Sequence, residues 1–177
     1  MPRLPYKLDD DAGPEEVVAP IRARRGGTLL NLDRQLLYSP PLAIGWNALM
    51  GAVRTGLGLP AALREIAICT VATLNRAAYE FHHHAPLLRA AGATEAQVDA
   101  LRDVDRALAT PELFDRAERA TIRLALEMTR SVEVAEPTFA AARSALGDDR
   151  HLVELIGTIA SYNMVSRVIV ALGIEPE

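Results

Sequence analysis

Apolar residues recur every three or four positions along most of the chain, which is the spacing of one face of an α-helix. No segment shows the sustained alternation of apolar and polar residues that a half-buried strand needs. Proline and glycine separate the periodic segments. The pattern therefore predicts an all-α protein, with helices over residues 15–25, 31–39, 42–55, 60–74, 77–91, 94–101, 111–131, 137–146 and 149–172.

Two of the predicted helices have little polar surface. Residues 60–74 are apolar on nearly every side, so we expect this helix at the centre of the core. The last helix carries Leu152, Leu155, Ile159 and Val170 on more than one face. This is more apolar surface than a chain of this size should leave exposed, and it predicts a homo-oligomer in which a second subunit covers the helix.

Length and charge limit the possible organisation. The chain has 177 residues, half of them hydrophobic, which is enough for one buried core. We interpret residues 1–28 as an N-terminal arm with a short helix and residues 29–177 as one helical domain. The net charge is -4, and the arginines at positions 22, 24 and 25 follow a run of acids, so we expect no nucleic-acid partner.

The sequence also bears on the cellular compartment. Its first residues lack the apolar segment of a signal peptide, and no run approaches the length of a membrane span. We therefore expect a soluble, cytoplasmic protein without a membrane partner. Cys69 is the only cysteine, which excludes a disulfide framework and a thiolate zinc site, and its apolar neighbours place it in the predicted core.

Ionisable residues gather within the otherwise apolar segment 65–84. Glu80 and His84 are four residues apart, so they share one helix face and can touch. A carboxylate that orients an imidazole is the smallest arrangement for moving a proton near neutral pH. Glu65 lies on the apolar helix 60–74, where burial would raise its pKa. The alternative for Glu65 is a buried ion pair with Arg64, Arg76 or Arg167.

Further candidates come from the same reasoning. Arg167 and Asn163 share a face of the apolar last helix, where a buried arginine must meet a carboxylate of the protein or of a ligand. Trp46 and Tyr79 are predicted as walls of a pocket or as core residues. Neighbouring helical residues point about 100 degrees apart, so the run at 82–84 cannot converge on one ion. We expect no metal site, and we place the histidines at positions 82 and 83 on the helix surface or in a subunit contact.

The segment around residues 65–84 resembles the carboxymuconolactone decarboxylase family, which shares its fold with alkylhydroperoxidase D-like proteins. In the broader group a glutamate is followed by Cys-x-x-Cys-x-x-x-His, and these positions correspond here to Glu65, Ala77, Glu80 and His84. Both cysteines are missing. The decarboxylase branch has an aromatic residue, a glutamate and then the histidine, which matches Tyr79, Glu80 and His84. The resemblance extends more loosely over residues 29–174.

The resemblance implies a cofactor-free enzyme that decarboxylates, or otherwise processes, a small carboxylated lactone of aromatic catabolism. It implies His84 as the acid and base, Glu80 as its orienter, Glu65 as a second relay or electrostatic support, and Arg167 as an anion clamp. It also implies a trimer or hexamer. A thiol peroxidase of the alkylhydroperoxidase type and a non-catalytic small-molecule-binding protein remain alternatives. The substrate and the pathway stay open.

Overall fold

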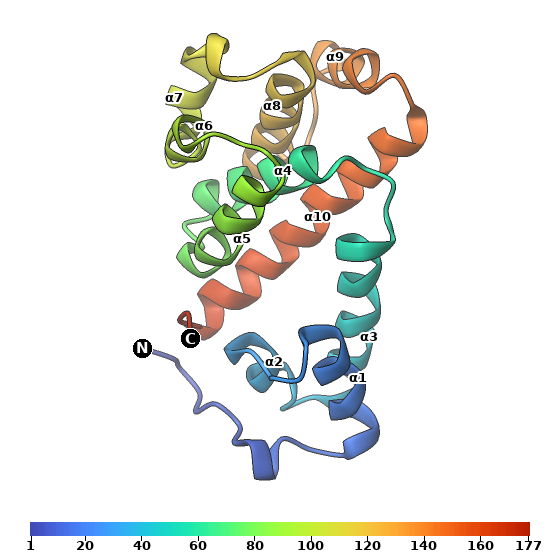
Figure 1. The fold of residues 1–177 in the computed structure, drawn as a ribbon, viewed down its shortest axis with the longest axis vertical. Helices are drawn as coiled ribbons and strands as arrows, with labels where there is room; N and C mark the ends of the chain where they lie inside the picture. The colour runs from blue at the N-terminus through green and yellow to red at the C-terminus, as the bar shows by residue number, and fades with distance from the viewer. The chain divides into compact units, whose positions relative to one another are not determined.

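The computed structural model describes residues 1–177, and every regular element in it is a helix (Figure 1), which confirms the all-α prediction. The chain forms two compact units. The first combines Met1–Leu57 with Val168–Glu177, and the second is Gly58–Arg167. The boundary predicted after residue 28 lies inside the first unit.

The first unit is built from short helices. They are η1 (Asp9–Asp11), α1 (Glu15–Arg25), α2 (Asn31–Leu36), α3 (Pro40–Gly51), the π-helical turn η2 (Ala52–Gly56) and the last residues of α10 (Asp149–Leu172). Pro14 precedes α1, and Glu15 and Glu16 occupy its first turn, where acids complement the helix dipole. Gly26 ends α1 in the left-handed conformation, with φ of 78°, which favours glycine.

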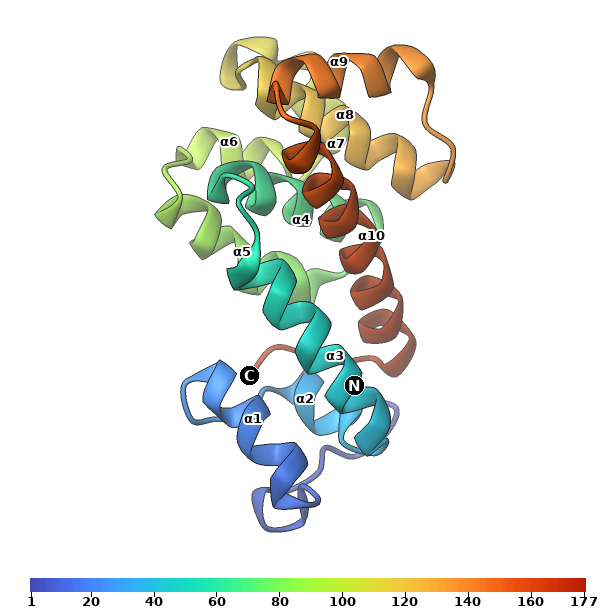
Figure 2. The same cartoon turned by 90° about the vertical axis from the view of Figure 1, so that its right-hand side faces the viewer.

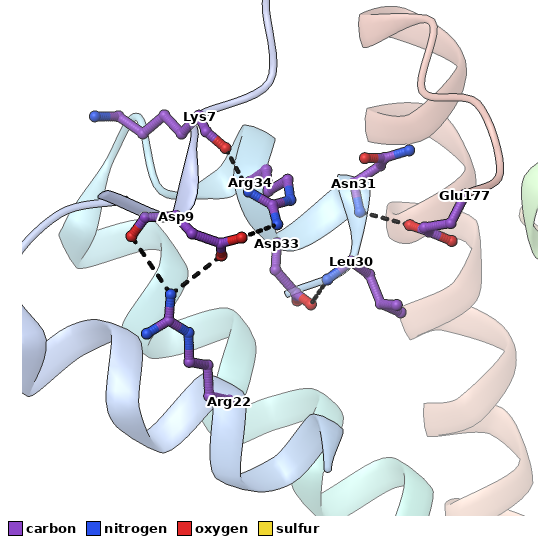
Figure 3. A network of polar contacts seen from close by, with 8 residues as sticks. All are labelled: Lys7, Asp9, Arg22, Leu30, Asn31, Asp33, Arg34 and Glu177. Atoms are coloured by element: carbon purple, nitrogen blue, oxygen red, sulfur yellow. Dashed lines mark hydrogen bonds and ion pairs between the residues drawn. The ribbon is translucent and has the colours of Figure 1, made fainter. Parts of the chain in front are cut away.

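A polar network ties the first unit together (Figure 3). Asp9 forms ion pairs with Arg22 at 3.1 Å and with Arg34 at 3.0 Å. The Arg34 hydrogen bond is the main reason why the pKa of Asp9 lies below its usual value. At the other end of the chain, the Glu177 carboxylate accepts a hydrogen bond of 2.6 Å from the backbone N–H of Asn31. The Asp9 carboxylate therefore compensates part of the charge of Arg22 and Arg34.

The second unit is centred on one helix. Its elements are α4 (Ala61–Leu74), α5 (Ala78–Ala90), α6 (Glu95–Ala100), α7 (Val104–Ala109), η3 (Pro111–Leu113), α8 (Arg116–Arg130), α9 (Glu136–Leu146) and most of α10. Helix α4 packs against both α5 and α8, and α9 lies along α8 (Figure 2). Six consecutive residues of α4, Ile66 to Val71, are fully buried. This confirms the predicted central position of α4.

The helix boundaries differ from the predicted ones where a capping side chain determines the first residue of the helix. The helix predicted from residue 111 begins at Arg116, because the Asp115 side chain accepts a hydrogen bond of 2.8 Å from the Glu118 N–H. Helix α7 was missed by the sequence pattern, and the Asp103 side chain caps it at the Arg106 N–H. A capping box formed by Thr94 and Gln97 begins α6, in agreement with the helix predicted over residues 94–101.

Helix α10 corrects two expectations. Leu152, Leu155 and Ile159 are buried within the chain itself, and of the four residues only Val170 is exposed. They therefore give no reason to invoke a second subunit, and the oligomer remains a prediction from the family resemblance. The expectation that no run approaches a membrane span was also wrong. By length and composition α10 could cross a membrane, although core helices of soluble proteins meet the same criterion.

Candidate active site

The turn between α4 and α5 brings two ionisable residues together. Helix α4 ends at Leu74, and Asn75 and Arg76 reverse the chain before α5 begins. The two helices then pack along each other, so that Glu65 of α4 meets His84 of α5. Both side chains are buried, with 2% of Glu65 and 4% of His84 exposed. The predicted approach of Glu65 to His84 is therefore present in the fold.

Both ring nitrogens of His84 have hydrogen-bond partners. Nδ1 lies 2.6 Å from the Glu65 Oε2 atom, and Nε2 lies 3.1 Å from the Tyr162 hydroxyl of α10. An ionised carboxylate can only accept, so Nδ1 carries a proton. In the neutral ring, Nε2 then accepts the Tyr162 O–H. The three side chains form a continuous path along which a proton can move between a carboxylate and a phenol.

The pKa of Glu65 is lower than that of an ordinary glutamate. Burial alone would raise it, but the hydrogen bond and charge of His84, with a smaller contribution from Arg64, outweigh the loss of hydration. The Arg64 Nε atom donates to Glu65 Oε1 over 3.1 Å. The predicted ion pair with Arg64 is confirmed, whereas the expectation of a raised pKa was wrong. Glu65 is ionised at neutral pH.

Glu80 lies in a different environment. It is 2% exposed, its Oε2 atom is 2.5 Å from the Ser166 hydroxyl, and its Oε1 atom is buried without a hydrogen-bond partner. No basic side chain contributes to its pKa, which burial raises to about 8, although the Ser166 hydrogen bond lowers it somewhat. At pH 7 most Glu80 side chains are therefore protonated and neutral.

The hydrogen bonds of Ser166 agree with a protonated Glu80. The Ser166 hydroxyl also lies 2.7 Å from the backbone carbonyl of Tyr162, which can only accept. A hydroxyl has one proton to donate. Ser166 can donate this proton to the ionised Glu80 carboxylate, which is why the bond lowers the pKa of Glu80. Once Glu80 is protonated, the acid can donate to Ser166 while Ser166 donates to the carbonyl. The chain of hydrogen bonds then runs from Glu80 to Ser166 and on to the backbone of α10.

The predicted role of Glu80 as the orienter of His84 was wrong. Glu65 and Tyr162 occupy the two ring nitrogens, and Glu80 hydrogen-bonds Ser166 instead. The two residues do share a face of α5, but each takes its partner from a neighbouring helix. Spacing along one helix shows which side chains are neighbours, and packing between helices decides which of them bond.

The remaining substrate-binding candidates do not join this cluster. Arg167 is exposed and donates to the backbone and side-chain oxygens of Asn163 at 2.7 and 2.8 Å, so the expected buried arginine paired with a carboxylate was wrong. Asn163 itself links Asn75 of the α4–α5 turn with Thr129 of α8. It holds three helical segments together.

The two aromatic candidates are both buried. Tyr79 is 5% exposed, and its ring lies 4.4 Å from the His83 ring. Trp46 belongs to the first unit, where it is 4% exposed and lines a small internal gap with Ile21 and Asp33. Both occupy core positions within their units, and their proposed contact with a substrate stays a prediction.

Cys69 is fully buried, and burial followed by the nearby charges of Glu65 and Glu80 raises the pKa of its thiol, so it is not a thiolate at neutral pH. His82 is exposed and His83 half-buried, in agreement with the surface prediction. No three His, Cys, Asp or Glu side chains come together as a metal site requires.

Two functional candidates, Tyr162 and Ser166, escaped the sequence reasoning. Both lie on α10, 78 and 86 residues away from the side chains that they bond. The available signal was their spacing: two hydroxyl residues four positions apart on an apolar helix share a face, which suggests a buried polar partner.

Comparison with known proteins agrees with this architecture. Over the full chain, the structure matches a peroxidase-related protein from Silicibacter sp. TM1040, with a TM-score of 0.81, 21% identity and 94% of that chain covered. It also matches, over the full chain, the alkylhydroperoxidase AhpD core of a peroxidase-related protein from Ralstonia eutropha JMP134, with a TM-score of 0.82, 20% identity and 93% of that chain covered. It also matches the debrominase Bmp8 in complex with 2,3,4-tribromopyrrole (0.77, 18% identity, 100% of this chain and 93% of that one).

Identities below 25% establish the fold alone. No curated protein matches the chain. Residues 40–125, which contain Glu65, Glu80 and His84, match the model of the carboxymuconolactone decarboxylase family. Through this segment the chain is similar to the carboxymuconolactone decarboxylase family, and the structure around it has the alkylhydroperoxidase D-like fold.

Proposed function

We propose that the protein is a cofactor-free acid–base enzyme that decarboxylates, or otherwise processes, a small carboxylated lactone. The observation that carries the proposal is the buried path from Glu65 through His84 to Tyr162. A histidine with an ionised carboxylate on one nitrogen and a phenol on the other is arranged to move protons at neutral pH.

Each member of the path has a distinct role. The Glu65 carboxylate stabilises the imidazolium that forms when His84 takes up a proton. His84 exchanges its Nε2 proton with the Tyr162 hydroxyl, which is the terminal donor to the substrate because both histidine nitrogens are already occupied. His84 thus acts through Tyr162, and Glu65 acts through His84.

The proposed decarboxylation consumes one proton. The bond between the substrate carboxylate and the ring breaks, carbon dioxide leaves, and the electron pair is delocalised onto the lactone carbonyl. Tyr162 donates its proton to the ring carbon, and His84, which has taken up one proton from solvent to become the imidazolium, returns a proton to the phenolate. His84 and Tyr162 are then back in their starting states, so atoms and charge balance.

The neutral state of Glu80 suits an anionic substrate. A second ionised carboxylate near His84 would repel the substrate carboxylate, whereas a carboxylic acid does not. Through Ser166, Glu80 also bonds the segment of α10 that carries Tyr162. We therefore assign Glu80 and Ser166 as residues that position Tyr162.

The second candidate is a thiol peroxidase or reductase, because two of the structural relatives are described as peroxidase-related proteins. That route needs a thiolate attacker and a resolving thiol. The chain offers only Cys69, which is fully buried and has a raised pKa. A non-catalytic binding protein is the third candidate, and substrate turnover distinguishes it from the first.

The test is a panel of carboxylated γ-lactones, with carbon dioxide release and ring-proton exchange followed by NMR. Tyr162→Phe and His84→Gln should each lower kcat by about 100-fold or more. Tyr38→Phe is the matched control, because it removes an exposed phenol of the first unit and should leave the rate unchanged.

Unchanged rates in both site variants would refute the relay. If no lactone reacts, and peroxide consumption with a dithiol depends on Cys69, the peroxidase reading replaces the proposal. Binding of a lactone without any turnover would favour the non-catalytic reading.

A further inference from the structure

A concave feature lies in the same unit as the acid–base cluster, on another side of α5. It is a hollow of about 580 Å³ between the α4–α5 turn, the outer face of α5 and the segment after α6. This volume is within the range of roughly 300–1,000 Å³ that is typical of small-molecule sites. None of Glu65, Glu80, His84 or Tyr162 lines it.

Its lining lies on a different face of α5 from the proton path. Phe81, Ala85 and Arg89 of α5 line the hollow. Successive helical residues are rotated by about 100 degrees, so these three cluster on one side, and Glu80 and His84 point well away from it. The hollow and the acid–base cluster are therefore separate sites on opposite flanks of one helix.

The polar part of the lining is cationic. Arg76, Arg89 and Arg102 line the hollow together with His82, and no acidic residue does. Arg89 is paired with Glu95, and Arg102 lies 3.5 Å from Asp99, so part of this charge is compensated from outside.

Arg76 is the exception, because no carboxylate compensates its charge. It is exposed and makes no side-chain hydrogen bond or ion pair. It also holds a positive φ of 56°, which costs a non-glycine residue free energy and is uncommon outside turns with a special role. A glycine or asparagine would satisfy this backbone at lower cost, so the turn gains nothing structural from an arginine.

The rest of the lining is apolar. Phe81, Ala85 and Pro86 form one wall, and the Arg102 guanidinium lies 4.6 Å from the centre of the Phe81 ring. This cation–π contact holds the Arg102 guanidinium beside the apolar wall. An apolar wall beside uncompensated positive charge suits a ligand with an apolar body and an anionic head.

We propose that this hollow binds a small organic carboxylate, with the ring or chain of the ligand against Phe81 and Pro86 and its carboxylate on Arg76 and Arg102. Such a site is separate from the acid–base cluster. It does not depend on the proposed function, because an anion can bind there whether or not the protein turns over a lactone.

The experiment is calorimetric titration of the full chain with benzoate, with benzamide as the uncharged ligand of the same shape and inorganic phosphate as the anion without an apolar body. Benzoate should bind one per chain with millimolar affinity, weakening as salt is added. Benzamide and phosphate should each bind at least about 10-fold more weakly, which corresponds to about 1.4 kcal/mol.

Variants distinguish specific benzoate binding in the hollow from general attraction to surface charge. Arg76→Gly removes the guanidinium and also relieves the positive-φ strain, so it should fold at least as well as wild type while benzoate affinity falls at least 10-fold. Arg102→Gln should have a similar effect. Arg123→Gln is the matched control: Arg123 is exposed, has no ion pair and lies outside the hollow, so its loss should leave benzoate binding unchanged.

Three results would overturn the proposal. The first is equal binding of phosphate and benzoate, and the second is an equal loss of benzoate affinity in the Arg76 and Arg123 variants. The third is the absence of benzoate binding at concentrations up to about 20 times the roughly millimolar dissociation constant expected for so small a ligand. If Arg76→Gly instead dissociates an oligomer in sedimentation without affecting benzoate binding, the hollow is a contact between copies of the chain and the ligand assignment fails.

Discussion

Glu65 and Glu80 are two buried carboxyls of one helical unit, each 2% exposed, whose pKa values shift in opposite directions. Burial pushes both upward. In Glu65 the two basic partners His84 and Arg64 outweigh the upward pKa shift that burial causes. Glu80 has only the Ser166 hydroxyl as a partner, and its second carboxyl oxygen has none. Depth of burial therefore does not decide the charge of a carboxyl. The chemistry of the groups that reach it does.

The largest effect is expected for Glu65→Gln. The substitution would leave Arg64 and His84 without their shared anion, and the free energy of unfolding at pH 7 should fall by about 3 kcal/mol. The variant should also lose part of the acid sensitivity of the protein. Because the folded pKa of Glu65 is lowered, its contribution is present above pH 4.5 and is lost as the pH falls through the folded value.

Urea unfolding between pH 3 and pH 7 measures both effects. Glu133→Gln, at an exposed glutamate of the same unit, is the control and should change stability by less than about 0.5 kcal/mol. If Glu65→Gln is no more destabilising than this control, Glu65 is not an ionised partner of His84.

Glu80→Gln should have the opposite dependence on pH. The folded pKa is raised to about 8 from 4.5, so wild type takes up a proton on folding between these values and its stability falls as the pH rises through them. Glutamine mimics the neutral acid and cannot ionise. The variant should match wild type within about 1 kcal/mol at pH 5 and be about 2 kcal/mol more stable at pH 9.

The same urea measurements at pH 5 and pH 9 test this expectation. A variant that is less stable than wild type at both pH values by the same amount would show that Glu80 is ionised throughout the range, and the contrast with Glu65 would disappear.

Ser166→Ala removes the one hydrogen bond of the Glu80 carboxyl. The cost should be about 1 kcal/mol, since a buried polar group loses its partner. The hydrogen bond also lowers the pKa of Glu80, so the loss of stability at alkaline pH should move to higher pH in the variant. A midpoint that moves to lower pH would contradict the assigned direction.

Arg64→Gln should have the smallest effect. Its side chain is 19% exposed, so solvent screens part of its interaction with Glu65, and the cost should stay below about 1 kcal/mol. Glu65 keeps His84, so its pKa should rise only slightly. An effect as large as that of Glu65→Gln would make Arg64, rather than His84, the principal partner.

The sequence predicted much of the fold because periodicity survives in long helices. The central helix α4 and the apolar α10 were both recognisable. Short α7 was missed, because six residues give too few repeats of the helical period and its beginning depends on the Asp103 cap. The burial of Leu152, Leu155 and Ile159 within the chain was missed for a different reason: an apolar pattern shows that a face is covered but not by what.

Some residues of the candidate site could be recognised in the sequence, but their hydrogen bonds could not. Glu65 and His84 were recognisable as ionisable residues within apolar helices. Their contact, and the choice of Ser166 over His84 by Glu80, depend on how α4, α5 and α10 pack. The prediction that Arg167 is buried was wrong, because the rotation of α10 about its own axis turns this side chain to the surface. Composition does not give that rotation.

A carboxyl 13C NMR titration of protein labelled at the glutamate side chains measures the charge of both carboxyls directly, and Glu65→Gln and Glu80→Gln assign the two signals. We predict that at pH 7 the Glu65 carboxyl is ionised and stays so to below pH 4.5, while the Glu80 carboxyl is protonated and titrates near pH 8. Titration of both carboxyls near pH 4.5, or Glu65 above Glu80, would contradict the division of charge on which the proposed proton path rests.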